Sequence, residues 1–295
     1  MTFSNLIKLV GIDAMFTPEL LIVSGLLVLY YWVAVTPSGP GKLQGAGPTV
    51  GQRLAFTTGC VIFYIGFGGP LNVMGHLLFS VHMLQQALLY LLMPPLLLAG
   101  LPESFYAYVL GKRVLGSVIR GLTRAIPAML LFNFAFSVYH WPPLFDLAMS
   151  NFWVHNTAHL ALLFTAICLW WPIFCPTAWY PGFSGLKKVG YIFMNGILLT
   201  PACACITFAG TALYELYTAG THTLCTPFYT SELDTTGLID FLTPVEDQQL
   251  GGVVMKITQE IIYGTVLGLV FFRWYREEKR EDDEPASPPQ KYSLS

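Results

Sequence analysis

Two histidines stand four residues apart in the stretch NFWVHNTAHLALLF, which covers residues 151–164. Residues at this spacing lie on the same face of an α-helix, so His155 and His159 can share a binding partner. Imidazole nitrogens are common ligands of copper and other transition metals. The alternative is structural, with each imidazole hydrogen-bonded to a neighbouring helix. The spacing therefore indicates either one wall of a metal site or a pair of buried packing residues.

Further histidines are candidate partners of this pair. His82 shares a helix face with Gln85 and Gln86 in an apolar segment, where an unpaired imidazole is costly. His76 lies six residues earlier, about 120° away around a helix axis, so the two can share an ion only if the helix is distorted. We therefore expect His82 to be the better ligand of the two. His140, in the stretch YHWPP, is a further candidate.

The last apolar segment carries polar residues in the stretch VEDQQLGGVVMKITQEIIYG. Asp247 offers a carboxylate, and Met255 offers a soft thioether of the kind that suits cuprous ion. Lys256 and Glu260 are four residues apart and are expected to pair on one helix face inside the membrane. That pair has either a functional role or a purely structural one that links helices.

Long apolar blocks must position these side chains. Of the 295 residues, 54% are hydrophobic and 11% are charged. A helix needs about 20 apolar residues to cross a bilayer, and lipid offers no partners for unpaired backbone groups. The blocks of this length are residues 18–36, 52–70, 75–98, 123–140, 152–174, 189–214 and 248–274. The sequence therefore predicts an all-α, polytopic integral membrane protein with seven transmembrane helices.

Lysine and arginine residues predict the orientation of the bundle, because loops rich in them stay in the cytoplasm. They occur at loops one, three and five and after the last helix, whereas loops two, four and six carry none. We therefore expect the N-terminus outside and the C-terminus in the cytoplasm, with all six histidines on the outer half. Residues 1–274 are expected to form the transmembrane domain, and residues 275–295, a polar mixture of both charge signs, a disordered cytoplasmic tail.

Three motifs in order resemble one family. They are HMLQQALLYLLMPPLLLAGLP at residues 82–102, HWPPLFDLAMSNFWVHNTAH at residues 140–159 and EDQQLGGVVMKITQE at residues 246–260. Together they resemble the CtaG family, the membrane-spanning assembly factors of caa-type cytochrome c oxidases from Bacillus-like bacteria. The resemblance covers nearly the whole chain. A single-span copper-delivery family shares the CtaG name, but its architecture differs from the one expected here.

The resemblance implies a non-enzymatic factor of the bacterial plasma membrane that helps to make active oxidase by handling copper for its metal centres. The expected partners are oxidase subunits, copper ion and the lipid bilayer, with no nucleic acid. The family positions map onto His82, His140, His155, His159, Asp247 and Gln248 of this sequence. We expect an outward-facing copper site in which His155 and His159 form one wall and His82 lies opposite, with His140 or Asp247 completing the site and Met255 as a further candidate ligand.

Three other functions fit parts of this pattern. A haem-binding electron carrier would use pairs of histidines on facing helices. A membrane metallohydrolase would place Asp247 beside histidine ligands to activate a water, but the chain has no H-E-x-x-H motif. A copper importer would use the same ligands for passage across the membrane.

Overall fold

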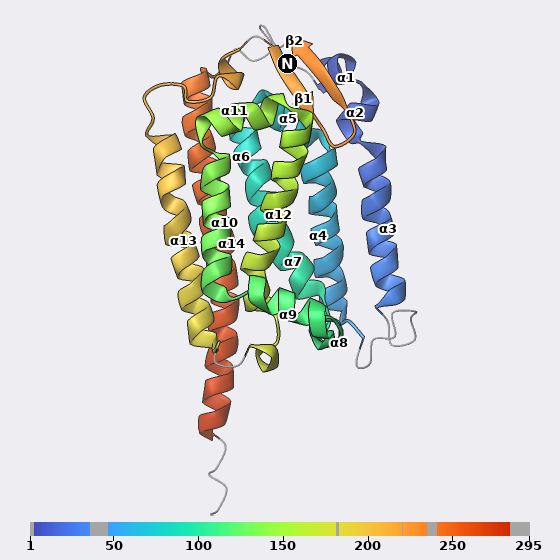
Figure 1. Ribbon diagram of the computed structural model, residues 1–295, viewed down its shortest axis with the longest axis vertical. Coiled ribbons are helices and arrows are strands. Elements are labelled where there is room, and N and C mark those ends of the chain that lie inside the picture. The colour runs from blue at the N-terminus through green and yellow to red at the C-terminus, as the bar shows by residue number, and fades with distance from the viewer. Residues whose placement is uncertain (1–2, 36–46, 181–182, 220, 235–240, 284–295) are drawn as a thin grey trace, which may run out of the picture.

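The computed structural model describes residues 3–35, 47–180, 183–219, 221–234 and 241–283, and it shows a bundle of long helices with short elements across both ends (Figure 1). Its helices are α1 (Phe3–Val10), α2 (Ile12–Phe16), α3 (Pro18–Ala34), α4 (Val50–Gly68), α5 (Pro70–Leu77), α6 (Phe79–Ala87), the π-helix η1 (Leu88–Leu92), α7 (Met93–Gly100), α8 (Glu103–Gly111), α9 (Arg113–Leu122), α10 (Ala125–Tyr139), α11 (Pro142–Ser150), α12 (Phe152–Phe174), the 3₁₀ turn η2 (Thr177–Trp179), α13 (Gly185–Thr207), the 3₁₀ turn η3 (Leu216–Thr218) and α14 (Pro244–Asp283). Its strands are β1 (Thr221–Cys225) and β2 (Thr230–Asp234).

The structure contains helices that are long and apolar enough to cross a membrane. Within the described residues they number six, Ile12–Ala34, Val50–Gly68, Phe79–Gly100, Phe152–Phe174, Gly185–Thr207 and Pro244–Arg280. The predicted fourth span is shorter, because α10 has 15 residues and is bent by 64° from α9. Counting this bent pair as one span gives up to seven. The chain is therefore a multi-pass helical membrane protein with six or seven spans.

The third predicted span is not one uniform helix, which corrects the sequence-based prediction. Leu78 adopts an extended conformation (φ −129°, ψ 126°) and separates α5 from α6. Further along, the π-helix η1 precedes Pro94, which has no N–H for the carbonyl of Tyr90. The indole Nε1 of Trp170 donates to that carbonyl at 3.1 Å. The freed backbone acceptor is thus satisfied by a neighbouring helix, as the membrane interior requires.

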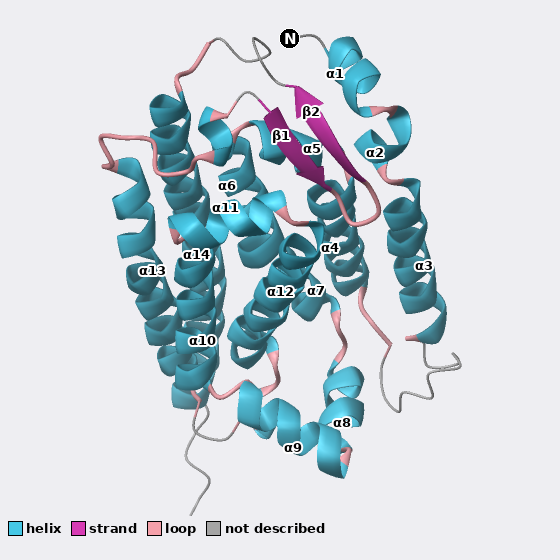
Figure 2. Cartoon of the chain, turned by 45° about the horizontal axis from the view of Figure 1, so that its top comes forward, coloured by secondary structure: helices cyan, strands magenta, loops and turns pink. Residues whose placement is uncertain are grey.

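A β-hairpin in the sixth loop is the exception to the all-α prediction. Strands β1 and β2 pair antiparallel, with Leu224 opposite Ser231 and His222 opposite Leu233. The buried side chains of Leu224 and Leu233 pack in a small second core with α1, α2 and α5. Figure 2 shows the hairpin lying over α5 at one end of the bundle. This part of loop six is therefore ordered and covers that end of the bundle.

Both ends of the predicted sixth span differ from the ends of the helix in the structure. The predicted sixth span, residues 189–214, is replaced by α13, which begins and ends earlier. Lys188, predicted in loop five, is a buried residue of α13 whose Nζ donates to the carbonyl of Ile173 at 2.8 Å and of Cys175 at 3.4 Å. It satisfies carbonyls at the C-terminal end of α12, which lack partners within that helix.

The predicted disordered tail begins too early. α14 continues as a helix through Asp283, so the prediction is wrong for residues 275–283, and residues 284–295 lie outside the described part of the chain. An ion pair joins Arg273 Nε and Glu277 Oε1 at 3.4 Å on this extension. Such pairs one turn apart favour a helix where propensity alone would be marginal.

The predicted contact between Lys256 and Glu260 is confirmed, with Nζ and Oε1 2.5 Å apart. Lys256 Nζ also donates to Thr200 Oγ1 on α13 at 2.7 Å. The pair is not buried within the protein, because the two side chains are 32% and 60% exposed. On a membrane-spanning helix such a surface faces lipid or a partner, where an unpaired charge remains costly.

Removing one member of this pair should destabilise the protein more than removing both. We expect Lys256→Met to lower the free energy of unfolding by roughly 1–3 kcal/mol, because it strands the Glu260 carboxylate. Glu260→Gln should lower the free energy of unfolding by less, because Lys256 Nζ still donates a hydrogen bond to Thr200 Oγ1. The double variant should be close to the parent in a thermal melt in detergent. The matched control, Arg273→Gln with Glu277→Gln, removes an exposed pair of the same spacing and should change stability by less than about 0.5 kcal/mol. Additive losses for Lys256 and Glu260 would contradict their coupling.

Candidate metal site

Five buried histidines lie together near the end of the bundle that the hairpin covers. This histidine cluster comprises His76, His82, His140, His155 and His159, which are 1–5% exposed. Their ring centres are 5.0 Å apart for His76 and His155, 4.3 Å for His155 and His159, 6.3 Å for His159 and His82, and 6.2 Å for His82 and His140. The structure therefore brings together the four histidines predicted as ligands and adds a fifth.

Local capping places His155 and His159 at the start of α12. The Oδ1 atom of Asn151 accepts hydrogen bonds from the backbone N–H groups of Trp153 at 3.0 Å and Val154 at 3.2 Å. This is the preferred role of asparagine at a helix N-terminus. The helix then presents the two imidazoles on one face, as their spacing predicts.

His82 is positioned by a residue distant in sequence. The carboxylate of Asp247, at the start of α14, accepts hydrogen bonds from Phe79 N at 2.6 Å, Ser80 N at 3.2 Å and Ser80 Oγ at 2.5 Å. These donors form the first turn of α6, so a negative charge caps the positive end of that helix. His82 follows in the same turn. Asp247 therefore contributes to the cluster by fixing the helix that carries one of its imidazoles.

This capping role bears on the prediction that Asp247 is a metal ligand. Both carboxylate oxygens already accept hydrogen bonds, so a metal would compete with three protein donors. Gln248, its neighbour, accepts from Leu213 N at 2.7 Å through Oε1. Met255 is fully buried in the main hydrophobic core. The structure thus shows structural environments for these residues of α14, and a ligand role for Asp247 or Met255 stays a prediction.

His76 joins the cluster although its spacing from His82 argued against this. The extended residue Leu78 interrupts the helix between them, which is the distortion that such sharing requires. His76 differs from the other members, because both of its ring nitrogens have partners. Nδ1 lies 2.9 Å from the carbonyl of Asn72, and Nε2 accepts from the backbone N–H of Cys225 at 3.2 Å. Its imidazole therefore supports the cluster and ties it to strand β1.

The other four imidazoles each have a buried nitrogen without a hydrogen-bond partner among the described residues. These atoms are His82 Nε2, His140 Nε2, His155 Nδ1 and His159 Nδ1. Leaving a buried polar atom unpaired is costly, and native proteins rarely do so without a functional reason. For His140 the other nitrogen, Nδ1, is 2.8 Å from the carbonyl of Phe136. That contact holds the proton on Nδ1 and leaves Nε2 with a free lone pair, the arrangement typical of metal-binding histidines.

The ring spacing of the four candidate ligands lies outside that of imidazoles that share one metal ion, because His155 and His159 are 4.3 Å apart and the other two neighbouring pairs are 6.2 and 6.3 Å apart. Two imidazoles that bind one ion through nitrogens about 2.0 Å from it have ring centres roughly 5–6 Å apart. His82 lies slightly beyond this range from both His140 and His159. Within the residues that the structure describes, no group of three or more His, Cys, Asp or Glu side chains is already arranged to hold a metal. The donor chemistry fits a transition metal, and the described conformation is not a closed cage.

Two further polar residues surround His159 and were not predicted. Tyr139 Oη and Gln86 Nε2 lie 3.4 Å and 3.5 Å from His159 Nε2. The signal available in the sequence was the proximity of Tyr139 to His140 and of Gln86 to His82. Around His82, the rings of Phe79, Phe145 and Tyr139 lie at 5.1–6.2 Å between centres. The cluster is therefore enclosed by aromatic side chains.

These features define a multi-pass helical membrane protein that buries a histidine cluster near one end of its bundle. The chain belongs to the cytochrome c oxidase caa3 assembly factor family (Caa3_CtaG), whose family model matches residues 28–277. The match confirms the family predicted from the three motifs.

The similar curated proteins are mycobacterial and uncharacterized. One from Mycobacterium leprae (strain TN) is 24% identical over 258 residues, covering 81% of this chain and 37% of that protein. Others from Mycobacterium bovis (strain ATCC BAA-935 / AF2122/97) and Mycobacterium tuberculosis (strain CDC 1551 / Oshkosh) are each 26% identical over 256 residues, covering 81% of this chain and 36% of those proteins. The chain thus spans little more than a third of the length of these relatives. No solved structure matches it.

Proposed function

We propose that this protein assists the assembly of a caa3-type cytochrome c oxidase by binding copper in its histidine cluster and passing the ion to the oxidase. The observation that carries the proposal is the set of four buried imidazole nitrogens that have no hydrogen-bond partner within the described part of the chain, in a member of an oxidase assembly family. The partners are oxidase subunits, copper as cargo and the bilayer of a bacterial plasma membrane. The role is that of a carrier and not of an enzyme.

The chemistry of the cluster supports a transfer site. Imidazole binds both copper oxidation states, so the same donors can accept and release the ion. A carrier must also release its cargo, which a closed tetrahedral cage of four ligands would resist. The spacing around His82, slightly too wide for tight sharing, suits an ion held by a few ligands at a time. Small ring rotations would then move the ion along the cluster.

Charge distribution supports an outward-facing cluster. The end of the bundle opposite the hairpin contains α8, α9, the start of α13 and the end of α14 (Figure 1). These elements carry Lys112, Arg113, Arg120, Lys187, Lys188, Arg273, Arg276, Lys279 and Arg280. Since basic segments remain in the cytoplasm, we place this end inside and the cluster outside.

The haem alternative is less well supported by the packing. Phe79 and Phe145 flank the ring of His82, and a macrocycle bound there would have to displace them. An absorbance spectrum of the purified protein distinguishes the two functions. A haem carrier would show a strong Soret band, whereas a copper carrier would show none.

Metal analysis of the purified full chain tests the proposal directly. After loading with cuprous ion and removal of excess by gel filtration, we expect about one copper per chain, because the four open nitrogens belong to one connected cluster. A parallel sample treated with a copper chelator should lose the metal and keep its fold. The proposal would be contradicted if the protein bound less than about a tenth of an equivalent of copper and still restored oxidase activity to a deletion strain.

A further inference from the structure

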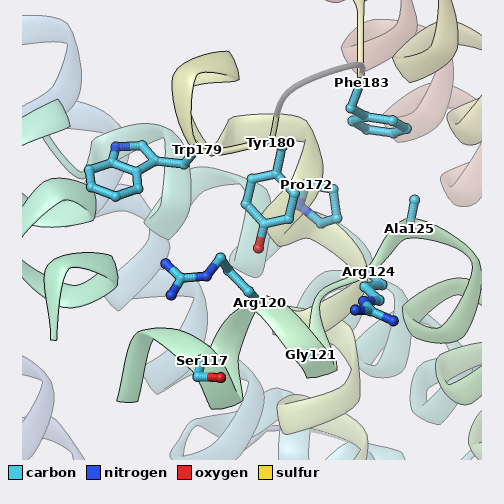
Figure 3. A pocket seen from close by; sticks show the side chains of 9 residues that line it. All are labelled: Ser117, Arg120, Gly121, Arg124, Ala125, Pro172, Trp179, Tyr180 and Phe183. Atoms are coloured by element: carbon cyan, nitrogen blue, oxygen red, sulfur yellow. The ribbon is translucent and has the colours of Figure 1, made fainter. Parts of the chain in front are cut away.

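A cavity of about 820 Å³ lies at the basic end of the bundle, away from the histidine cluster. It is formed where α9 meets α10, against Pro172 of α12 and the segment that follows it. Two arginines, Arg120 and Arg124, line it, and none of its nine lining residues is acidic (Figure 3). Arginine remains charged at all relevant pH values and matches the geometry of phosphate oxygens. The cavity therefore has the charge and the donors for an anionic group.

The two guanidinium groups retain donors for a ligand. Arg120 Nη1 donates to the carbonyl of Leu110 at 3.0 Å, which fixes the side chain against α8. A guanidinium carries five N–H donors, so most of those of Arg120 remain. Among the described residues, neither Arg120 nor Arg124 forms an ion pair with a carboxylate. The side chain of Arg120 is thus held in place, and no described carboxylate neutralises its charge.

Tyr180 lines the cavity, but its hydroxyl does not offer a hydrogen-bond donor to a bound anion. The hydroxyl of Thr123 donates to the carbonyl of Ile119 at 2.7 Å and is also hydrogen-bonded to the Tyr180 hydroxyl. Because the Thr123 proton is used, Tyr180 must be the donor in their contact. Burial raises the pKa of Tyr180, so the phenol keeps this proton. Recognition of an anion consequently depends on the arginines, while Tyr180, Trp179 and Phe183 supply apolar walls.

Helix α9 indicates the depth of the cavity in the bilayer. It exposes the apolar side chains of Val114, Leu115 and Val118, at 77%, 49% and 52%, and also carries Arg113 and Arg120. It is bent by 64° from α10, which belongs to the bundle. A short amphipathic helix of this kind lies in the membrane interface with its apolar face toward the acyl chains. The cavity is then at the level of the lipid headgroups.

We propose that this cavity binds the phosphate group of an anionic phospholipid. Basic pockets between membrane helices on the cytoplasmic side select such headgroups. The arginines contact the phosphate, the aromatic walls pack against the glycerol region, and the exposed apolar side chains of α9 lie beside the acyl chains. A bound lipid would thus hold α9 against the end of α12.

Binding to the detergent-purified full chain tests the proposal with three probes. These are short-chain phosphatidylglycerol, short-chain phosphatidylcholine and inorganic phosphate, each followed by microscale thermophoresis. We expect phosphatidylglycerol to bind at least about tenfold more tightly than phosphatidylcholine, because charge-assisted hydrogen bonds to arginine are strong. Inorganic phosphate should bind weakly and should not compete at the same concentration. Equal binding of phosphate and phosphatidylglycerol would show a site for free anions and would overturn the lipid assignment.

Variants distinguish the cavity from general attraction of the basic end. Arg120→Gln with Arg124→Gln should reduce phosphatidylglycerol binding at least about tenfold. The control Lys112→Gln with Arg113→Gln removes two charges from the same basic end of the bundle that do not line the cavity, and it should retain binding. Gly121→Leu keeps all charges and narrows the cavity beside Arg120, since Gly121 lines it and nothing lies within 4 Å of a Cβ added there. It should also lose binding, which tests the site even if the arginine variant folds poorly. Binding that survives Gly121→Leu, or that falls equally in the control, would overturn the proposal.

Discussion

Replacing His82 with Phe should abolish copper binding while leaving the protein in the membrane at near-normal abundance. His82 is surrounded by aromatic rings, so a phenyl ring fits the same space, and the substitution removes a buried nitrogen that has no described partner. Replacing an unsatisfied polar group by an apolar one of similar shape is neutral or stabilising. Loss of groups that only orient a metal ligand costs 10–100-fold in affinity, so loss of a ligand should cost more than about 100-fold. Copper titration and a thermal melt of the same preparations measure both quantities.

Two controls separate ligands from supporting residues. His76→Phe removes hydrogen bonds to Asn72 and Cys225, so it should lower the melting temperature and leave most copper binding intact. The double variant of His82 and His140 should bind no less copper than either single variant, since one broken site cannot be broken twice. A variant at His82 that keeps full copper stoichiometry, or loses stability in step with binding, would show that the histidines are structural.

Asp247→Ala should be among the most destabilising single substitutions in this chain. It removes a charged acceptor from two backbone N–H groups and one hydroxyl at the start of α6. Loss of a helix cap costs about 1–2 kcal/mol, and the additional buried donors bring the expected loss to roughly 3 kcal/mol. Asp247→Asn retains one carbonyl oxygen and should lose about half as much. Thermal melts in detergent should rank the variants in this order.

Asp146→Ala is the matched control for this substitution. Its carboxylate also accepts from two backbone N–H groups, those of Glu215 and Leu216, but it is only partly buried and serves a short loop. The expected loss is about 1 kcal/mol or less. Copper affinity should fall for Asp247→Asn and remain unchanged for Asp146→Ala, because only the former shifts the helix that carries His82. Equal effects at both positions would argue against the positioning role of Asp247.

The long apolar blocks predicted most of the fold, because a membrane span needs a continuous apolar segment that is visible in the sequence. Local spacing was equally informative within one helix. His155 and His159 lie 4.3 Å apart between ring centres, and Lys256 meets Glu260, as a separation of four residues implies. These features depend only on helix geometry.

Features set by distant contacts could not be predicted in this way. The break at Leu78 has no proline or glycine at that position, and it is stabilised by Asp247, which is remote in sequence. His76 therefore appeared to face away from the cluster. The hairpin had a detectable local signal, because residues 221–234 are rich in β-branched side chains with Pro227 at the turn. The strands are short, and only the packing of Leu224 and Leu233 on the bundle makes them stable.

The contact between Asp247 and α6 has a consequence for biosynthesis. Phe79 and Ser80 are made 168 and 167 residues before the carboxylate that caps them. Because membrane domains are synthesised from the N-terminus onward, a nascent chain holds α6 without its cap until α14 has left the ribosome. During that interval the helix carrying His82 has no fixed start. Under the proposed function, full copper affinity would therefore be acquired only after α14 has been made, which would delay loading of the cluster until α14 caps α6.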